Sequence, residues 1–217
     1  MKWRHVVLIV VVCVSLVVSA VLIAASRQPD TLTVTRSLEM PVPPGQVFPL
    51  VNDLHQMQKW SPWAKLDLQA TNSFAGPESG TGAVFRWSGN SNVGEGSMEI
   101  TDSVPDQQVD ILLSFVQPFQ SQNNVSFTFE PQGDGTLVTW TMTGEANLVT
   151  KVLGLFVDMS QMVGGQFEEG LNNLKQEAQA AAPKSPEMPS EKSSETPPEK
   201  PSETPAEKFP AKPEEKS

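Results

Sequence analysis

The sequence predicts an α+β fold, in which an antiparallel sheet of about six to seven strands packs against a long C-terminal helix. Apolar and polar residues alternate in successive short runs between residues 32 and 143, the pattern of half-buried strands. Turn residues separate these runs about every ten positions, so the connections are too short for crossover helices and neighbouring strands must be antiparallel. From residue 148 to 174 the apolar period changes to three or four, which is helical.

Composition divides the 217 residues into three parts, with boundaries at 1–29, 30–182 and 183–217. The first part is apolar and carries three basic residues and no acid. The middle part holds six basic and seventeen acidic residues and contains the predicted domain. The last part holds nine of the nineteen prolines and many Lys, Glu, Ser and Thr residues. It cannot bury enough apolar surface to fold, so we expect a disordered tail.

The first part predicts a transmembrane segment. Twenty residues from Val6 to Ala25 carry no charge, and at about 1.5 Å per residue they span a hydrocarbon layer about 30 Å thick. The alternative is a signal peptide cleaved after Ala20 or Ala25, which would give a secreted protein. We favour an uncleaved single-pass anchor because the apolar core of a secretory signal is usually about 7–15 residues long.

The basic residues around this segment predict its orientation. Lys2 and Arg4 precede the apolar run, and only Arg27 follows it closely. The positive-inside rule then places the N-terminus in the cytoplasm. The domain would lie on the other side of the membrane, in the periplasm of a bacterium. The protein would contact the bilayer through the N-terminal anchor.

The middle part is predicted to begin with a strand and a helix. Leu32, Val34 and Leu38 alternate with polar residues up to Met40, which indicates a strand with one buried face. Prolines 41, 43 and 44 end that strand, and a proline is well suited to the first turn of a helix. A helix with an apolar face is therefore expected through residue 54, followed by a short turn-rich piece as far as residue 63.

The next five runs predict the rest of the sheet. Each alternates apolar with polar residues, and each is bounded by Gly, Pro, Asn or Asp. The expected strands are Ala83–Ser88, Ser97–Val104, Val109–Phe115, Val125–Glu130 and Val138–Thr143.

The last apolar run predicts one long helix. Its apolar stripe must lie on the apolar face of the sheet, and the twist of the sheet would leave a space between them. Gly164 and Gly165 interrupt the stripe, so we expect a kink there. Arg36 shares the parity of the apolar residues of the first strand, but we expect a strand irregularity to turn it to solvent.

Short segments carry a family resemblance: Pro41–Phe48, Trp60–Trp63, Phe127–Phe129 with Gly133–Thr136, and Phe167–Leu171 with Leu174 and Lys175. They resemble the polyketide cyclase/dehydrase branch of the SRPBCC superfamily, which also includes START lipid-transfer domains and birch-pollen-allergen-like proteins. The resemblance covers about residues 31–178. It implies a helix-grip fold, in which a curved antiparallel sheet wraps around the C-terminal helix and encloses an apolar pocket. The superfamily includes both carriers and enzymes, and the resemblance supplies no catalytic motif.

The pocket of such a fold would be lined by inward-facing strand residues and by the last helix. Aromatic and methionine side chains together suit a pliable site for an apolar ligand. The alternative is a core filled by the same side chains. The expected lining residues are Trp60, Trp63, Trp87, Ile111, Leu113, Phe115, Phe127, Phe129, Trp140, Met142, Leu155, Phe156, Met159, Met162 and Val163.

Only one histidine lies in the middle part, and this limits catalysis. Asp53 and His55 are weak candidates for an acid/base pair, because residues two apart on a helix point to different faces. His55 lies in a polar stretch and is more often a surface residue there. The chain has one cysteine and two histidines, so we expect no metal site, and it has no tyrosine that could act as a phenol acid. No nucleotide-binding glycine motif occurs, and we expect no cofactor.

These observations leave three functions open. The first is a membrane-anchored binding module for a hydrophobic small molecule or lipid. The second is a cyclase- or dehydratase-like enzyme that uses acid/base residues in the pocket. The third is an envelope interaction protein that acts through its surface and its tail. The formal net charge of −10 argues against nucleic acid as a partner.

Overall fold

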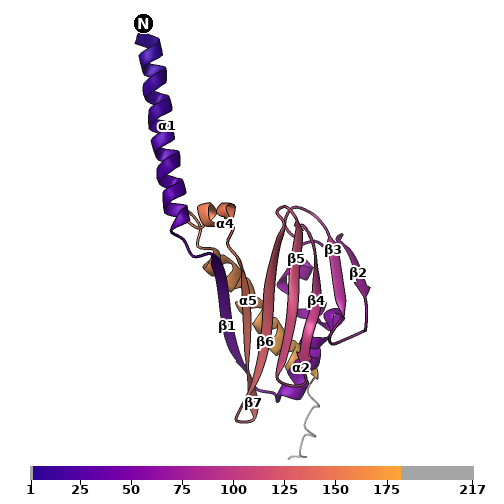
Figure 1. Ribbon diagram of the computed structural model, residues 1–217. Coiled ribbons are helices and arrows are strands. Elements are labelled where there is room, and N and C mark those ends of the chain that lie inside the picture. Colours follow the sequence, from indigo (N-terminus) through magenta and orange to yellow (C-terminus); the bar gives the residue numbers. More distant parts are fainter. Residues whose placement is uncertain (1, 182–217) are drawn as a thin grey trace, which may run out of the picture. The chain divides into compact units, whose positions relative to one another are not determined.

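The computed structural model describes residues 2–181, so the predicted tail from residue 183 lies outside the described residues. Within them the predicted α+β fold is confirmed (Figure 1). Seven strands form one antiparallel sheet in the order β1-β7-β6-β5-β4-β3-β2. The strands are β1 (Thr31–Met40), β2 (Thr71–Ala75), β3 (Val84–Ser88), β4 (Glu95–Val104), β5 (Gln108–Gln117), β6 (Ser121–Gln132) and β7 (Gly135–Glu145).

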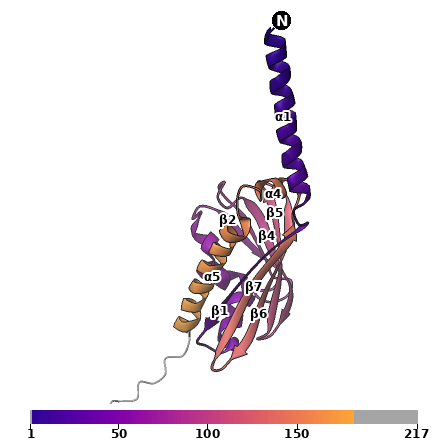
Figure 2. The same ribbon diagram turned by 90° about the vertical axis from the view of Figure 1, so that its left-hand side faces the viewer.

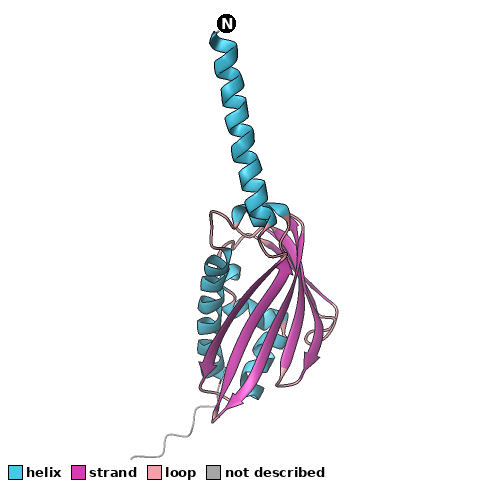
Figure 3. Ribbon diagram, turned by 60° about the vertical axis from the view of Figure 1, so that its left-hand side comes forward, coloured by secondary structure: helices cyan, strands magenta, loops and turns pink. Residues whose placement is uncertain are grey.

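Helices cover one face of this sheet. α2 (Pro44–Asn52) and α3 (Leu54–Trp60) follow β1, and the one-turn helix η1 (Pro62–Lys65) comes next. α5 (Met159–Ala181) runs along the same face (Figure 2). Figure 3 shows the strands with the helices on one side, which is the helix-grip arrangement. The apolar face of the sheet packs against these helices and forms the core.

α1 (Lys2–Ser26) contains the predicted transmembrane segment. From Trp3 to Ser26 it is long and apolar enough to cross a membrane, although a signal sequence would pass the same test. Only residues 27–30 separate it from β1. The structure therefore has the N-terminal apolar helix that both the anchor and the signal-peptide interpretation require.

The sheet places its polar residues on the outer face. Hydroxyls of β1 and β7 pair across the strands, Thr33 with Thr143 at 3.2 Å and Ser37 with Thr139 at 2.8 Å. Val34 and Met142, which are also cross-strand partners, face the helices instead. The alternation read from the sequence thus predicts which face of each strand is buried.

The sequence did not predict β2. Thr71–Ala75 pairs only with β3 at the edge of the sheet, and all five of its residues are exposed. A strand without a buried face has no reason to alternate, so periodicity carries no signal for it.

The predicted single helix from residue 148 is wrong, and Gly164 and Gly165 do not break the helix that contains them. The chain forms α4 (Leu148–Leu153), leaves the helix at Gly154, and begins α5 at Met159. Oδ1 of Asp158 accepts a hydrogen bond from the N–H of Gln161 at 3.0 Å, which starts the new helix. A capping residue therefore divides the apolar stripe, and the two glycines lie inside a continuous α5.

Arg36 faces the helices and does not turn to solvent as expected. Its Nε donates to Oε1 of Glu168 on α5 at 2.6 Å, and its Nη1 donates to the backbone oxygen of Thr35. A Cβ on Gly164 would lie 2.0 Å from Nη2 of Arg36, so the glycine leaves room for the guanidinium. An inward arginine is tolerated because a carboxylate pairs with it.

Gly170 and Gly165 on α5 provide a matched pair of tests for helix–sheet packing. A Cβ on Gly170 would lie 2.8 Å from the ring of Trp140 and 3.2 Å from Pro62, whereas one on Gly165 would meet nothing within 4 Å. We expect Gly170→Ala to lower the free energy of unfolding by about 1–3 kcal/mol. Gly165→Ala should raise it by about 0.5–1 kcal/mol through helix propensity. Thermal unfolding of both variants measures the difference, and equal shifts of the same sign would contradict this packing.

Candidate functional site

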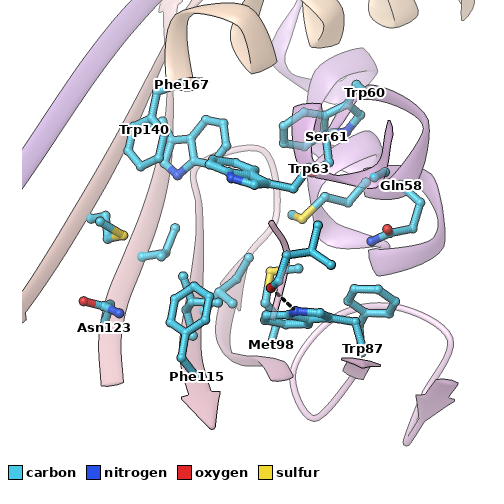
Figure 4. A pocket seen from close by; sticks show the side chains of 18 of the residues that line it. Gln58, Trp60, Ser61, Trp63, Trp87, Met98, Phe115, Asn123, Trp140 and Phe167 are labelled. Carbon is cyan, nitrogen blue, oxygen red and sulfur yellow. Dashed lines mark hydrogen bonds between the residues drawn. The ribbon is translucent and has the colours of Figure 1, made fainter. Parts of the chain in front are cut away.

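A cavity of about 290 Å³ lies between the sheet and the helices α3, η1 and α5. Its wall is mainly apolar and aromatic (Figure 4). The deep part is made by buried side chains such as Ile111, Val125 and Phe127, while Asn72 and Asn92 on its rim are exposed. The volume is at the lower end of the range for sites that bind small organic ligands, about 300–1,000 Å³.

The structure brings ten of the expected lining residues to this wall. They come from three parts of the fold, namely the α3–η1 region, the inner face of four strands, and the second turn of α5. Each strand residue has the inward parity that the alternation predicts. These residues are Trp60, Trp63, Trp87, Ile111, Leu113, Phe115, Phe127, Trp140, Met142 and Val163.

Five expected lining residues lie elsewhere. Phe129 is buried in the core, with its ring 5.7 Å from that of Phe48 on α2 in an edge-on contact. The others are Leu155, Phe156, Met159 and Met162, which lie in the α4–α5 connection or in the first turn of α5. The break at Gly154 carries this segment away from the cavity, and Phe156 and Met162 are exposed to solvent.

Sequence reasoning missed both apolar and polar lining residues. Phe85 shares its strand parity with Trp87, so the alternation could have identified it. Gln58, Asp67, Asn92 and Asn123 supply polar groups toward the rim. Asp67 and Asn92 lie in connections, where no periodicity signals a direction, whereas Asn123 shares its strand parity with Val125 and Phe127.

The aromatic side chains form a connected wall at the deep end of the cavity. The rings of Trp140 and Phe167 are stacked at 4.0 Å, and Trp63 meets both of them edge-on at about 6 Å. Trp60 donates from Nε1 to the backbone oxygen of Leu50 at 2.9 Å. These contacts fix the rings, so the wall keeps its shape without a ligand.

Two indole N–H groups differ in their hydrogen bonding. Nε1 of Trp87 donates to the backbone oxygen of Val93 at 3.0 Å, the bond drawn in Figure 4. Nε1 of Trp140 is buried and has no hydrogen-bond partner among the described residues. A hydrogen bond from an indole N–H restricts how the ring can turn. The indole of Trp87 is therefore held by a hydrogen bond, whereas that of Trp140 is held by contacts with other rings.

Asp53 and His55 lie together but outside the cavity lining. Asp53 is the N-cap of α3, and its Oδ1 accepts from the backbone N–H of His55 at 2.7 Å and lies 3.2 Å from His55 Nδ1. The imidazole stacks on Phe74 with ring centres 3.8 Å apart. The chain leaves the helix at Asp53, which removes the geometric objection to pairing, yet neither side chain lines the cavity.

The geometry therefore gives Asp53 a structural role. We expect Asp53→Ala to lower the free energy of unfolding by about 1 kcal/mol, because two backbone N–H groups lose their acceptor. His55→Ala should lower the free energy of unfolding by less than this. It should leave the binding of an apolar probe unchanged. Chemical denaturation and a binding assay on both variants check this; loss of binding in His55→Ala would bring the catalytic interpretation back.

Among residues 2–181 no cluster of three or more His, Cys, Asp or Glu side chains could hold a metal ion. The site instead offers an enclosed apolar volume with a polar rim. Together with the curved sheet and the α5 helix, this defines a helix-grip protein with an internal cavity.

The family model for polyketide cyclase/dehydrase and lipid transport matches residues 31–179. The chain therefore belongs to this family, and the superfamily inferred from the sequence motifs is confirmed. The family and the fold together suggest a module that binds a hydrophobic ligand. A comparison with curated proteins found no match.

Solved structures share the fold. The Mll3558 protein from Rhizobium loti is 23% identical with a TM-score of 0.50, over 68% of this chain and 96% of that one. Protein MLL2253 from Mesorhizobium loti is 15% identical with a TM-score of 0.52, over 70% and 100%. TTHA0849 from Thermus thermophilus is 19% identical with a TM-score of 0.51, over 70% and 100%. At these identities the likeness establishes the fold alone.

Proposed function

We propose that the protein is a membrane-anchored binding module that holds one hydrophobic small molecule or lipid in the cavity. The single observation that carries this proposal is the cavity itself, about 290 Å³ with a mainly apolar wall. Burial of a ligand there is favourable by about 25 cal/mol per Å² of apolar surface removed from water. The polar groups near the rim, such as Gln58 and Asn123, would orient a polar end of the ligand.

A titration tests this function. The full-length chain in a mild detergent is incubated with radiolabelled hexadecanoic acid as a long-chain probe and then separated by gel filtration. Saturable retention approaching one probe per chain supports the proposal. Retention that rises without saturation, as for detergent micelles alone, would contradict it.

The membrane anchor is the second part of the proposal. α1 would stay uncleaved and cross the bilayer once, with the N-terminus in the cytoplasm and the domain in the periplasm. An anchor suits a ligand that partitions into lipid, since tethering raises the rate of encounter between cavity and bilayer.

The mass of the mature chain decides between anchor and signal peptide. We expect the chain to remain in the membrane fraction after alkaline washing, with an intact mass that includes residues 6–25. A shorter chain that begins after Ala20 or Ala25 and appears in the soluble periplasmic fraction would establish the signal peptide instead.

The other two functions have weaker support. A cyclase or dehydratase needs an acid/base pair in the cavity, and the lining holds no histidine and one carboxylate, Asp67, near its rim. Interaction through the tail involves residues outside those described. Deletion of residues 183–217 addresses it: loss of a cellular complex while probe binding persists would favour an interaction protein.

A further inference from the structure

The antiparallel sheet sorts the connecting loops into two ends. β1 starts where α1 stops, and the strands alternate in direction across the sheet. The loops that follow η1, β3, β5 and β7 therefore lie at the same end as the start of β1 (Figure 1). We call this the α1 end. The loops that follow β1, β2, β4 and β6 lie at the opposite end, which we call the far end.

Exposed apolar side chains are concentrated at the α1 end. Outside α1, twelve large apolar side chains of the described residues are exposed, and ten of them lie at this end. Leu68 is 83% exposed, Phe156 74% and Phe119 62%. We call these ten side chains, which come from residues 66–68, 116–119 and 148–162, the apolar collar. Clustering of this kind marks an interaction surface, because single exposed apolar residues would be scattered.

The apolar collar adjoins the residues that line the cavity. Asp67 and Ala70, which line the cavity, belong to the same loop as Leu68. Val163 lines it too and directly follows the collar segment that ends at residue 162. Asn92, an exposed lining residue, lies in the β3–β4 turn at this end, whereas the far-end loops contribute none of the lining.

The short connection to α1 decides what can cover the apolar collar. The five Cα steps from Ser26 to Thr31 span at most about 18 Å when fully extended. A backbone hydrogen bond from Gln28 N–H to Ala25 O continues the helical turn and shortens this reach. If α1 crosses a bilayer, this short connection holds the α1 end of the domain at the membrane surface. This is true at any angle between α1 and the domain.

The charges of the α1 end are mixed. Lys65 ends η1 and Asp67 follows two residues later, while the ion pair of Lys151 with Asp30 connects α4 to the residue before β1. The Lys151 ammonium holds the pKa of the Asp30 carboxyl below its usual range. That pairing is therefore present at neutral pH and lost only as the pH falls through the lowered pKa. Among residues 2–181 this end has no strongly basic patch for anionic lipid, so its attraction to a bilayer would be hydrophobic.

We propose that the apolar collar inserts into the bilayer that α1 crosses, so that the cavity mouth opens onto the lipid. An apolar ligand then passes between bilayer and cavity without crossing water. The inference rests on the proposed function, because it requires α1 to be an anchor and the cavity to be a binding site. It adds the source of the ligand, which is a molecule dissolved in the membrane, and the side of the domain by which that molecule enters.

Site-specific labels test the insertion, with the native Cys13 in α1 as the reference. An environment-sensitive fluorophore is attached to Cys13 in the natural sequence. In a Cys13→Ser background it is attached to Phe156→Cys, to Phe119→Cys, or to Asp134→Cys in the far-end β6–β7 turn. Each full-length chain is reconstituted into phosphatidylcholine vesicles, with or without phosphatidylcholine that carries a nitroxide on its acyl chain.

We expect lipid nitroxides to quench the labels at 13, 156 and 119, with blue-shifted emission, and to leave the label at 134 unchanged. Raising the salt concentration should not reverse the quenching. If the label at residue 13 is quenched but the labels at residues 156 and 119 are unchanged, as at residue 134, the inference is overturned. The proposal that α1 is an anchor would then still stand. Absence of quenching at 13 would overturn both. A blue shift at 156 without quenching would show that a second copy or another protein covers the collar, which also overturns it.

Discussion

Trp60→Ala should lower the free energy of unfolding by about 3–5 kcal/mol, the usual loss for a fully buried tryptophan. This residue connects three parts of the fold. Its Nε1 donates to Leu50 of α2, its backbone oxygen accepts from Nδ2 of Asn173 on α5 at 3.1 Å, and its ring meets Phe127 and Trp140 of the sheet edge-on. Truncation removes all ring contacts together and leaves the Leu50 carbonyl without that donor.

Thermal unfolding of the full-length chain in detergent measures this loss. A loss of 3–5 kcal/mol corresponds to a Tm lower by about 6–20 °C for a domain of this size. Phe119→Ala is the matched control, since it also truncates an aromatic ring but at an exposed position. Trp60→Phe should fall between the two. If Trp60→Ala and Phe119→Ala shift the Tm equally, the core does not have the packing described.

Leu113→Trp should weaken binding of the hexadecanoic acid probe roughly 70-fold. The side chain of Leu113 lines the cavity, and a larger ring there would occupy volume that the ligand needs. Losing about 100 Å² of buried ligand surface costs about 2.5 kcal/mol, which gives this factor. Saturation binding on the purified variant measures it.

Leu112→Trp controls for the substitution itself. Leu112 is the next residue on β5 and is absent from the cavity lining, so it carries the same change on the opposite face of the sheet. Binding to this variant should match that of the natural chain. Equal loss of binding in the two variants would mean that the probe does not occupy the cavity.

The sheet and its inner face could be predicted because each central strand has one buried face. Strand parity predicted that Trp87, Leu113 and Trp140 face the pocket implied by the family resemblance, and the structure places all three on the cavity wall. The same argument fails for β2, which has no buried residue. Periodicity reports burial, so an edge strand exposed on both faces leaves no trace in it.

The C-terminal part shows a different limit. The apolar period continues from Leu148 into α5, although the chain turns between Gly154 and Asp158. Phe156 and Met162 keep the spacing of core residues but lie on the surface. An apolar stripe does not distinguish a core from an interface with lipid, because both remove the side chains from water. Two of the residues that sequence reasoning misplaced, Phe156 and Met162, thus belong to the proposed membrane contact.

Asp53 and His55 illustrate the limit for candidate chemistry. Proximity in sequence suggested an acid/base pair, and the structure does bring their side chains within 3.2 Å. Yet the carboxylate already accepts two backbone N–H groups as a helix cap, and the imidazole rests on Phe74. An aspartate and a histidine can act as an acid/base pair on a ligand only if their side chains line the cavity that holds the ligand.

Analysis of what the protein carries when it is purified tests the central claim most directly. The full-length chain is isolated from its membranes, extracted with organic solvent, and the extract is analysed by mass spectrometry beside extracts of Leu113→Trp and Leu112→Trp. We expect one apolar compound, approaching one molecule per chain, in the natural protein and in Leu112→Trp, and a strong depletion in Leu113→Trp. Identical lipid content in all three extracts would contradict a binding cavity between the sheet and α5.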